Sequence, residues 1–287
     1  MEIDTFSIII PARNESAGLR RILPALAGLG LEAEIIVVDD GSSDETAQIC
    51  SAFDVRLVRH PYPMGNGAAI KSGARAAKGD VLLFMDADGQ HQPEDIPAML
   101  EKFNEGYDMV VGARVSGSHA GAHRAVANDL FSRFASWMVG QTVEDLTCGF
   151  RIVRADKFRQ FLYLLPNGFS YPTTITMSFF RAGYSVGYVP IHTPARIGKS
   201  HIRPLRDGVR FLLIIMKIGT LYSPFKLFLP ISFLFFLSGL GYYAYTFAMF
   251  HRFTNMSALL FSTSLLVFLM GLISEQITML NYRDSER

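Results

Sequence analysis

Cysteine is scarce in this sequence, with only Cys50 and Cys148 among 287 residues. Two thiols are too few for a disulfide scaffold or for a zinc site with four thiolate ligands. Charged residues are also few, at 18%, whereas hydrophobic residues reach 49%. This balance excludes a disordered or low-complexity chain, and it indicates that apolar residues are concentrated in particular segments.

Motifs of several enzyme classes are missing as well. A His-Glu-x-x-His zinc motif does not occur. The glycine run 65–67 lacks the third glycine of a dinucleotide fingerprint, because Ile70 stands at that position, and it lacks the Gly-Lys-Ser/Thr of a P-loop. The sequence therefore supports neither a NAD-binding motif nor an ATPase motif. We expect the glycine run to pass close to a ligand or to turn the chain into a helix that carries Lys71.

Positive charge is unevenly placed along the chain. Residues 1–190 contain 17 basic and 22 acidic residues, whereas residues 191–287 contain 10 and 4. An acidic N-terminal part argues against binding to nucleic acid. The positive excess lies beside the most apolar part of the chain, where an anionic membrane surface would attract it.

Two long segments carry no charged residue. Residues 227–250 form a run of 24 and residues 253–274 a run of 22. Since a helix needs about 20 apolar residues to cross the core of a bilayer, both runs are long enough. The connection around 251–255 is short and polar. We therefore predict a hairpin of two transmembrane helices over 227–280, followed by a tail over 281–287.

The segment before the hairpin, residues 204–226, is mostly apolar but carries Arg206, Arg210 and Lys217. Apolar residues with basic residues on successive turns favour a helix that lies at the membrane interface. An amphipathic core helix is the alternative interpretation.

The start of the chain, MEIDTFSIIIP, is acidic and does not resemble a signal peptide. The N-terminal region is therefore expected to stay in the cytoplasm, and two crossings return the C-terminus to that side. Basic residues flank the hairpin there, whereas its connection has only Arg252, in agreement with the positive-inside rule. The flanking residues are Arg203, Arg206, Arg210, Lys217, Lys226, Arg283 and Arg287. The sequence thus predicts an integral protein of the bacterial inner membrane, or an equivalent one, with both termini cytoplasmic.

Residues 1–203 are predicted to form a cytoplasmic catalytic domain. In its first part, short and nearly continuous apolar runs alternate with helical patterns, as is typical of parallel strands covered on both faces. The predicted strands are 6–10, 34–38, 55–58, 81–85 and 109–113, and the predicted helices are 17–29, 44–52, 67–78, 93–105 and 123–139. This alternation indicates an α/β domain with right-handed crossovers.

Acidic residues follow two of the predicted strands, at the edge where open α/β sheets bind ligands. Asp86 and Asp88 offer carboxylates, and Gln90 offers a further oxygen, which together suit Mg²⁺ or Mn²⁺. A solvated turn is the alternative for this group. Asp39 and Asp40 fit hydrogen bonding to a base or ribose, or else the capping of a turn.

Basic side chains could hold phosphate oxygens near this edge, although each could instead be an ordinary surface charge. They are Arg114, Arg124, Arg151, Arg196 and Lys199. Arg196 and Lys199 stand just ahead of the membrane segment, where a headgroup phosphate would lie. His91, which follows the acidic group closely, is expected to have a supporting or structural role.

Five motifs, in order, resemble those of family 2 glycosyltransferases, and the resemblance covers about residues 1–205. They are Pro11-Ala-Arg-Asn-Glu15, Val38-Asp-Asp-Gly-Ser42, Gly65-Asn-Gly-Ala-Ala-Ile-Lys71, Asp86-Ala-Asp-Gly-Gln90 and Thr147-Cys-Gly-Phe-Arg151. The chain looks most similar to polyprenyl-phosphate glycosyltransferases, the group of dolichyl-phosphate mannose synthase and its bacterial undecaprenyl-phosphate relatives. The predicted hairpin is similar to that of the two-helix members of this group.

The resemblance implies an α/β fold: a glycosyltransferase A-type, Rossmann-like domain with a mostly parallel sheet, then an interfacial helix and the transmembrane hairpin. It also implies a UDP- or GDP-sugar donor, Mg²⁺ or Mn²⁺, and a polyprenyl phosphate acceptor in the lipid bilayer. The implied donor-site residues are Pro11, Asn14, Glu15, Asp39, Asp40, Lys71 and Asp86. The implied metal ligands are Asp86, Asp88 and Gln90. The implied catalytic set is Asp88, Arg114, Arg124, Arg196 and Lys199, with the basic side chains on the acceptor phosphate and the pyrophosphate.

The expected reaction is a metal-dependent, inverting transfer of a sugar to the lipid phosphate. A phosphate monoester is already anionic and needs no strong general base, so the site must align the reactants and neutralise the leaving group. The alternatives are a glycosyltransferase for a different lipid acceptor and a catalytically inactive membrane scaffold that binds nucleotide sugars. The sugar, the nucleotide, the lipid length and a homo-oligomeric state are left open.

Overall fold

The computed structural model describes residues 5–115, 122–168, 171–193, 216, 219–220 and 223–283. The chain divides into two compact units, residues 1–203 and 204–287. Most of the predicted interfacial segment 204–226 lies outside the described residues, so its helix stays a prediction.

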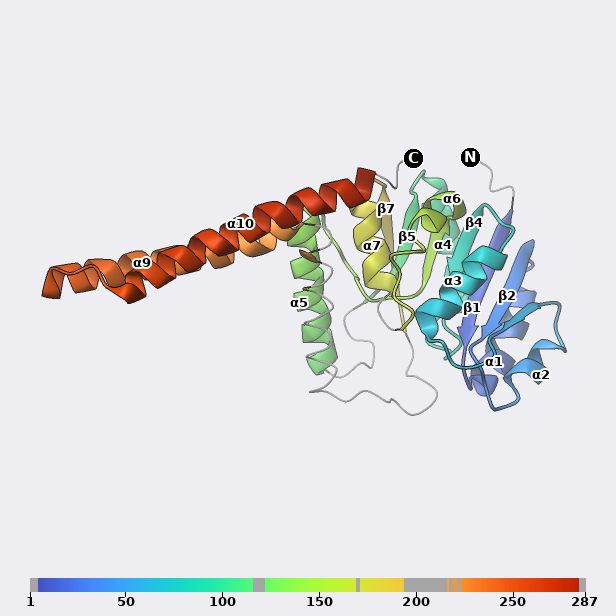
Figure 1. Cartoon of the computed structure of the whole chain (residues 1–287). Coiled ribbons are helices and arrows are strands. Elements are labelled where there is room, and N and C mark those ends of the chain that lie inside the picture. The colour runs from blue at the N-terminus through green and yellow to red at the C-terminus, as the bar shows by residue number, and fades with distance from the viewer. Residues whose placement is uncertain are drawn as a thin grey trace. The chain divides into compact units, whose positions relative to one another are not determined.

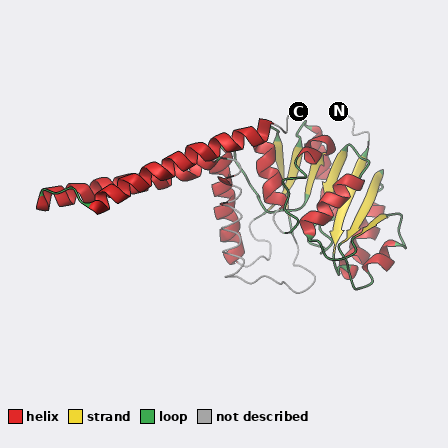
Figure 2. Ribbon diagram, viewed as in Figure 1, coloured by secondary structure: helices red, strands yellow, loops and turns green. Residues whose placement is uncertain are grey.

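A seven-stranded mixed sheet forms the centre of the first unit, with the order β3-β2-β1-β4-β6-β5-β7 (Figure 2). All strands run parallel except β6, which pairs antiparallel with β4 and β5. The strands are β1 (Phe6–Ala12), β2 (Ala33–Asp39), β3 (Arg56–Arg59), β4 (Val81–Phe84), β5 (Met109–Arg114), β6 (Arg151–Arg154) and β7 (Val186–Ile191). The predicted α/β fold with a mostly parallel sheet is confirmed.

Helices lie on both sides of the sheet (Figure 1). They are α1 (Ser16–Gly28), α2 (Thr46–Cys50), α3 (Asn66–Ala76), η1 (Pro93–Asp95), α4 (Ile96–Asn104), α5 (Ala122–Val139), α6 (Ala155–Gln160) and α7 (Tyr171–Arg181). Helix α3 packs on β1 and β2, and α4 packs on β5, β6 and β7. The five predicted strands and five predicted helices agree with these bounds to within two residues, with η1 and α4 together forming one predicted helix.

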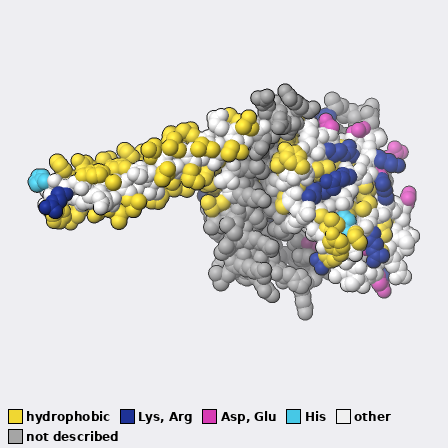
Figure 3. Space-filling model, viewed as in Figure 1, with side chains coloured by type: hydrophobic (Ala, Val, Ile, Leu, Met, Phe, Trp, Pro, Cys, Tyr) yellow, Lys and Arg dark blue, Asp and Glu magenta, His cyan; other side chains and the backbone are white. Residues whose placement is uncertain are grey.

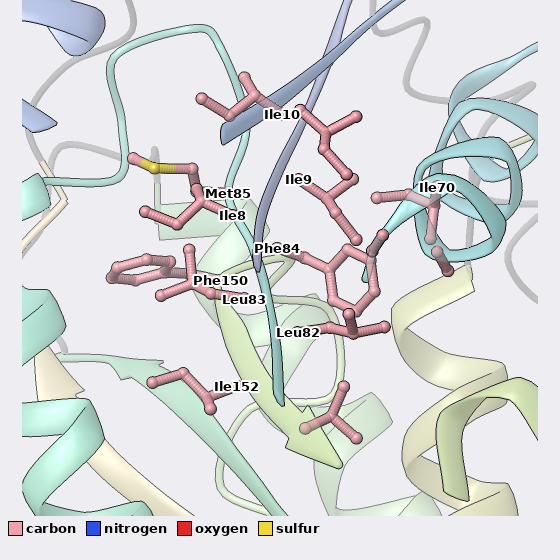
Figure 4. Close-up of a cluster of buried hydrophobic side chains, with 14 of the residues drawn as sticks. Ile8, Ile9, Ile10, Ile70, Leu82, Leu83, Phe84, Met85, Phe150 and Ile152 are labelled. Carbon is pink, nitrogen blue, oxygen red and sulfur yellow. The ribbon is translucent and has the colours of Figure 1, made fainter. Parts of the chain in front are cut away.

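The core explains why the strand runs are apolar throughout. Every residue of β1 and β4 is buried, because helices cover both faces. Ile8 pairs with Leu83 and Ile9 with Phe84 across β1 and β4, within the cluster shown in Figure 4. Each such side chain contributes roughly 1.5–3 kcal/mol when it is fully buried.

Strand β6 was not predicted. Its sequence, Arg-Ile-Val-Arg, has only two apolar residues between arginines, so it gives little strand signal. It nevertheless joins the interior, with Arg151, Ile152 and Val153 all buried. Antiparallel insertion between β4 and β5 brings Arg151 opposite Val111 and opposite Phe84, the last residue of β4.

The strand order places a binding edge beside β1. The chain moves from β1 outward to β3 and then returns to β4 on the other side of β1, so the order reverses between β1 and β4. Ligands of open α/β sheets bind at such a reversal, at the carboxyl ends of the strands. Asp39 pairs with Ala12 in register, and β4 ends two residues before Asp86.

The second unit contains two long helices, α9 (Pro224–Phe250) and α10 (Asn255–Arg283). Both are long and apolar enough to cross a membrane, and only 11% and 17% of their most apolar windows are buried. Hydrophobic side chains cover their visible surface, as Figure 3 shows. The turn between them begins at His251, whose φ of 48° ends α9. The two helices correspond to the two predicted apolar runs.

Small residues let these helices pack closely. The Ser232 hydroxyl donates to the Ser264 carbonyl at 2.9 Å, and the Ser264 hydroxyl donates to the Ser232 carbonyl at 2.9 Å. A Cβ on Gly239 would lie 3.1 Å from the Leu260 side chain, and one on Gly271 would lie 2.8 Å from the Phe228 side chain. Reciprocal hydrogen bonds and glycine contacts therefore set the register of the hairpin.

The serine pair gives a testable prediction for this unit. The double variant Ser232→Ala, Ser264→Ala should lower the free energy of unfolding by about 1 kcal/mol, because interhelical hydrogen bonds in membranes contribute little more than this. Denaturation of the full chain in mixed micelles measures the change. Ser262→Ala, at an exposed position of α10, is the matched control. Equal unfolding midpoints for the two variants would show that the pair does not stabilise the hairpin.

Candidate active site

Asp39 ends β2 with a fully buried carboxylate. Its Oδ1 accepts the Ser42 N–H at 2.8 Å, which closes the turn after the strand. Its Oδ2 is buried and has no hydrogen-bond donor among the described residues, although Arg59 Nε lies 3.3 Å away. Buried oxygens of this kind are normally hydrogen-bonded, so Oδ2 is suited to accept an N–H from a ligand.

Asn14 connects the end of β1 to this turn. Its backbone has a φ of 55°, a left-handed conformation that asparagine tolerates. The side-chain Oδ1 accepts the Ser43 N–H at 2.9 Å, and the Asn14 N–H donates to Ser42 Oγ at 3.0 Å. Pro11 pairs with Val38 in the adjacent strand. The structure thus brings the predicted donor residues Pro11, Asn14 and Asp39 together, with the partly exposed Glu15 directly before α1.

The Asp40 carboxylate is directed to the loop after β3. It accepts hydrogen bonds from His60 Nδ1 at 2.8 Å, Met64 N at 2.7 Å and Gly65 N at 2.8 Å. Burial alone would raise the pKa of Asp40, but these hydrogen bonds outweigh burial and lower it. A direct contact between Asp40 and a donor stays a prediction, and it would require some of these bonds to break.

Gly65 and Gly67 allow the chain to pass close to another segment of itself. Gly65 has a φ of +105°, and a Cβ on Gly67 would lie 1.9 Å from the Pro166 carbonyl oxygen. Gly67 N donates to the Gly168 carbonyl at 3.2 Å. Lys71 Nζ donates to the Leu165 carbonyl at 3.1 Å, and it also hydrogen-bonds Asn167 Oδ1. The run turns into α3 as predicted, while Lys71 contacts the 165–168 segment.

Asp86 and Asp88 follow β4. The Asp86 side chain is 37% exposed, and its backbone N–H donates to His91 Nδ1 at 2.8 Å. Asp88 is buried, and its Oδ1 accepts the Gln90 N–H at 3.1 Å. A Cβ on Gly18 would lie 1.8 Å from the Ala87 carbonyl oxygen, so only glycine lets α1 approach this loop. The turn therefore holds two carboxylates at the edge that the strand order indicates.

His91 supports this turn in its neutral form. Burial lowers its pKa to about 4, with the positive charges of Arg114 and Arg151 acting in the same direction and Asp88 opposing them. Because Nδ1 accepts a hydrogen bond, the ring proton is on Nε2, which lies 4.0 Å from Asp86 Oδ2. The ring stacks on Phe150 at 5.0 Å. This agrees with the supporting role expected from the sequence.

Arg114, at the end of β5, is held by a buried acidic partner. Its Nε and terminal nitrogen donate to the two oxygens of Asp145 at 2.7 and 2.9 Å. Asp145 also accepts the N–H groups of Thr147 and Cys148 at 3.0 and 3.1 Å. Burial would raise the pKa of Asp145, but Arg114 and these N–H groups lower it. The pair anchors the Thr147–Arg151 motif to β5.

Two further arrangements look like hydrolase sites. Asp40, His60 and Ser72 form a hydrogen-bonded series, with Ser72 Oγ 2.9 Å from His60 Nε2. Ser72 lies inside α3, where backbone N–H groups are used by the helix and none is free to stabilise an oxyanion. A Gly-x-Ser-x-Gly run occurs at 183–187, but Ser185 precedes β7 and hydrogen-bonds Asp108. A nucleophile elbow instead follows its strand, so neither arrangement supports hydrolysis.

Comparison with known proteins identifies the family. Residues 7–162 match the model described as Glycosyl transferase family 2. The chain belongs to glycosyltransferase family 2. Residues 223–280 match the GtrB C-terminal hairpin, which covers α9 and most of α10. The family resemblance of the five motifs is confirmed, and so is the expectation that the protein is a glycosyltransferase.

Three proteins with assigned names are similar in sequence to this family 2 glycosyltransferase. It is 27% identical to the dolichyl-phosphate hexose transferase of Haloferax volcanii, over 75% of this chain and 94% of that one. It is 26% identical to glycosyltransferase AglJ of the same organism, over 99% and 97%. It is 33% identical to the undecaprenyl-phosphate 4-deoxy-4-formamido-L-arabinose transferase of Pseudomonas paraeruginosa, over 58% of this chain, and the match spans about half of that longer relative, 55%.

A solved structure shares the fold. Glucosyl-3-phosphoglycerate synthase from Mycobacterium tuberculosis, solved with Mn²⁺, UDP and glucosyl-3-phosphoglycerate, superposes with a TM-score of 0.59 at 22% identity. The match covers 75% of this chain and 78% of that one. This similarity confirms the predicted glycosyltransferase A-type fold.

The predicted basic residues of the glycosyltransferase are only partly placed. Arg196 and Lys199, and the side chain of Arg124 in α5, lie outside the described part. Arg151, which the sequence offered either as a phosphate contact or as a surface charge, is neither, because its side chain is fully buried. It donates to the Pro172 carbonyl and to Thr176 Oγ1, each at 3.1 Å, and to the Cys148 carbonyl.

The residues at the β4 edge fit the oxygen ligands that a divalent cation prefers. Within the described residues, no group of three or more His, Cys, Asp or Glu side chains could hold a metal ion. Two carboxylates and the Gln90 amide nevertheless match the preference of Mg²⁺ and Mn²⁺ for oxygen, and such sites are commonly completed by substrate phosphates and water. Asp86, Asp88 and Gln90 therefore stay the predicted ligands of a divalent cation.

Asp145 and Tyr171 are the residues that sequence reasoning missed. Asp145 stands two residues before Thr147, and the Tyr171 hydroxyl donates to the Gly149 carbonyl at 3.0 Å. Both act on the Thr147–Arg151 motif from outside it. An acidic or aromatic residue near a motif carries no signal of its own, so only the contacts reveal their roles.

Proposed function

We propose that this glycosyltransferase transfers a sugar from a nucleotide-sugar donor to a membrane polyprenyl phosphate in one inverting displacement. The proposal rests on the Asp86–Asp88 carboxylates at the β4 edge of a chain that also carries two helices long enough to cross a membrane. The named relatives that act on dolichyl or undecaprenyl phosphate support this acceptor class.

The donor nucleoside is proposed to bind at Asp39. Its buried Oδ2 is paired with Arg59 Nε at 3.3 Å but accepts no hydrogen bond from the described residues, and the N3–H of uracil or the N1–H of guanine would supply one. Guanine presents a second N–H group beside the first, whereas Asp39 Oδ1 already accepts the Ser42 N–H. Because a carboxylate oxygen can accept more than one hydrogen bond, Asp39 fits either base, and a panel of UDP- and GDP-sugars distinguishes the two nucleotides.

Asp86, Asp88 and Gln90 are proposed to hold Mg²⁺ or Mn²⁺ against the donor pyrophosphate. The bound cation would supply positive charge to offset the charge of the leaving nucleoside diphosphate. The Mn²⁺ and UDP of the glucosyl-3-phosphoglycerate synthase structure support such a pairing of metal and nucleotide.

The acceptor phosphate is proposed to meet Arg114, Arg124, Arg196 and Lys199. Their charges would orient an acceptor that is already ionised, so no side chain has to remove a proton. Asp145 is consistent with this, because its carboxylate is committed to Arg114 and two backbone N–H groups. Attack from the face opposite the leaving group would convert an α-linked donor into a β-linked sugar phosphate.

The catalytic unit and both termini are proposed to be cytoplasmic. The basic residues around the hairpin support this orientation, because the connection between α9 and α10 carries only Arg252. Polyprenyl phosphate in the cytoplasmic leaflet would then meet the cytoplasmic pool of nucleotide sugars.

The reaction can be tested with the purified full chain in detergent. Incubation with Mn²⁺, polyprenyl phosphate and a panel of UDP- and GDP-sugars should release nucleoside diphosphate from one donor, and only when the lipid is present. Release with diacylglycerol in place of polyprenyl phosphate would establish a different lipid acceptor. Donor binding without release across the panel would instead support the inactive scaffold.

A further inference from the structure

The main chain at Cys148–Gly149 lies directly against the Asp86 carboxylate. A Cβ built on Gly149 would be 3.1 Å from Asp86 Oδ2 and 3.3 Å from the Tyr171 hydroxyl. A side chain at position 149 would require the carboxylate to shift by a few tenths of an ångström from its observed place. The position of this short segment therefore limits the positions that Asp86 can take.

Three buried side chains hold the segment from different elements. The Tyr171 hydroxyl, from α7, donates to the Gly149 carbonyl at 3.0 Å. Arg151, from β6, donates to the Cys148 carbonyl, and Asp145 accepts the Cys148 N–H at 3.1 Å. The Cys148 N–H and both carbonyl groups of the segment thus have partners inside the domain, where the loss of one partner is costly.

Tyr171 is itself fixed on both sides. Its side chain is buried, and its ring lies edge-on to Phe84 at 6.2 Å and beside the Arg151 guanidinium at 5.7 Å. Arg151 also donates to the carbonyl of Pro172, the next residue in α7. Burial raises the pKa of Tyr171, so its hydroxyl stays protonated and acts as a donor.

We propose that Tyr171 is a positioning residue for Asp86, acting through Gly149 on the metal affinity of the site. Without the Tyr171 hydroxyl, the Gly149 carbonyl loses its partner and the segment can move away from Asp86. The carboxylate then gains other rotamers and holds a cation less well. This inference rests on the proposed function, in which Asp86 binds the metal that meets the donor pyrophosphate.

The test measures the binding of Mn²⁺ to the full chain in the presence of UDP. Electron paramagnetic resonance reports the concentration of free Mn²⁺. Tyr171→Phe removes one oxygen and should weaken Mn²⁺ binding about 10-fold, the lower end of the effect of residues that support metal ligands. In turnover assays the half-saturating Mn²⁺ concentration should rise in parallel, with a smaller change in kcat at saturating Mn²⁺. The melting temperature reports the fold separately.

Tyr184→Phe is the matched control. It removes a tyrosine hydroxyl that donates to Gln160 Oε1 at 2.9 Å, in the same domain but outside the site. Its Mn²⁺ affinity should equal that of the unaltered chain. A folded Tyr171→Phe variant with the same affinity as this control would overturn the proposal.

Gly149→Ala provides a second, independent variant. The added methyl group would press on Asp86 Oδ2 and should also weaken Mn²⁺ binding. If Tyr171→Phe does not fold, a folded Gly149→Ala variant with unchanged Mn²⁺ affinity overturns the proposal. Failure of the unaltered chain to bind Mn²⁺ with UDP would refute the metal site of the proposed function itself, an outcome distinct from a difference between variants.

Discussion

Asp88→Asn should lower kcat by about 10³-fold while the protein stays folded. Electrostatic groups that act on a leaving group commonly contribute effects of this size when they are removed singly. The substitution keeps the size of the side chain and an oxygen that can accept the Gln90 N–H. It removes the negative charge of the side chain. The fall in kcat therefore measures what that charge, and its attraction for a bound cation, contribute to the reaction.

The measurement is lipid-dependent release of nucleoside diphosphate at saturating donor, with the melting temperature recorded alongside. Glu94→Gln is the control, because Glu94 is an exposed carboxylate shortly after the same turn. It should leave kcat within about twofold. Turnover by Asp88→Asn close to that of this control would show that Asp88 is not a metal ligand.

The sequence was sufficient for most of the fold because its signals are local. Strands β1, β2 and β4 follow from apolar runs of four or more residues, and a sheet covered on both faces needs such runs. Strand β6 has no such run, since Arg151 and Arg154 bound only two apolar residues. Its pairing depends on β4 and β5, which lie far away in the sequence, so a local pattern does not reveal it.

The same difference between local sequence signals and contacts with distant segments applies to the site. Asp39, Asp86 and Asp88 were predicted because they follow strands whose carboxyl ends meet at one edge. Asp40 and Lys71 lie near that edge, but the direction of a side chain depends on its partners, which are the 60–65 loop and the 165–168 segment. Proximity could therefore be predicted, whereas the observed contacts could not.

Asp145→Asn should lower the free energy of unfolding by about 2–3 kcal/mol. Removing one partner of a buried ion pair costs about 3–5 kcal/mol, and the cost is smaller here because water reaches part of Arg114, whose side chain is 35% exposed. The Thr147 and Cys148 N–H groups would also lose a charged acceptor. Denaturant unfolding of the full chain at neutral pH measures the loss.

Activity of Asp145→Asn should fall as well, because Arg114 and the Thr147–Arg151 motif share this anchor. Glu45→Gln is the matched control for stability, since it breaks the exposed Arg20–Glu45 pair of 2.6 Å and should cost under about 1 kcal/mol. A double-mutant cycle with Arg114→Gln should show a coupling of about 1–3 kcal/mol. Additive effects would mean that the pair does not act as a unit.

The pH dependence of Asp145→Asn separates the charge of Asp145 from its packing. The pKa of Asp145 is lower in the folded state than in the unfolded state, so the unfolded chain binds the proton more readily. The stabilisation is therefore fully present above the unfolded pKa of about 4, and it is lost as the pH falls through the folded pKa. The stability difference between the unaltered chain and Asp145→Asn should narrow below about pH 4. A difference that stays constant down to acid unfolding would instead assign the effect to packing and hydrogen-bond geometry, with no contribution from the charge.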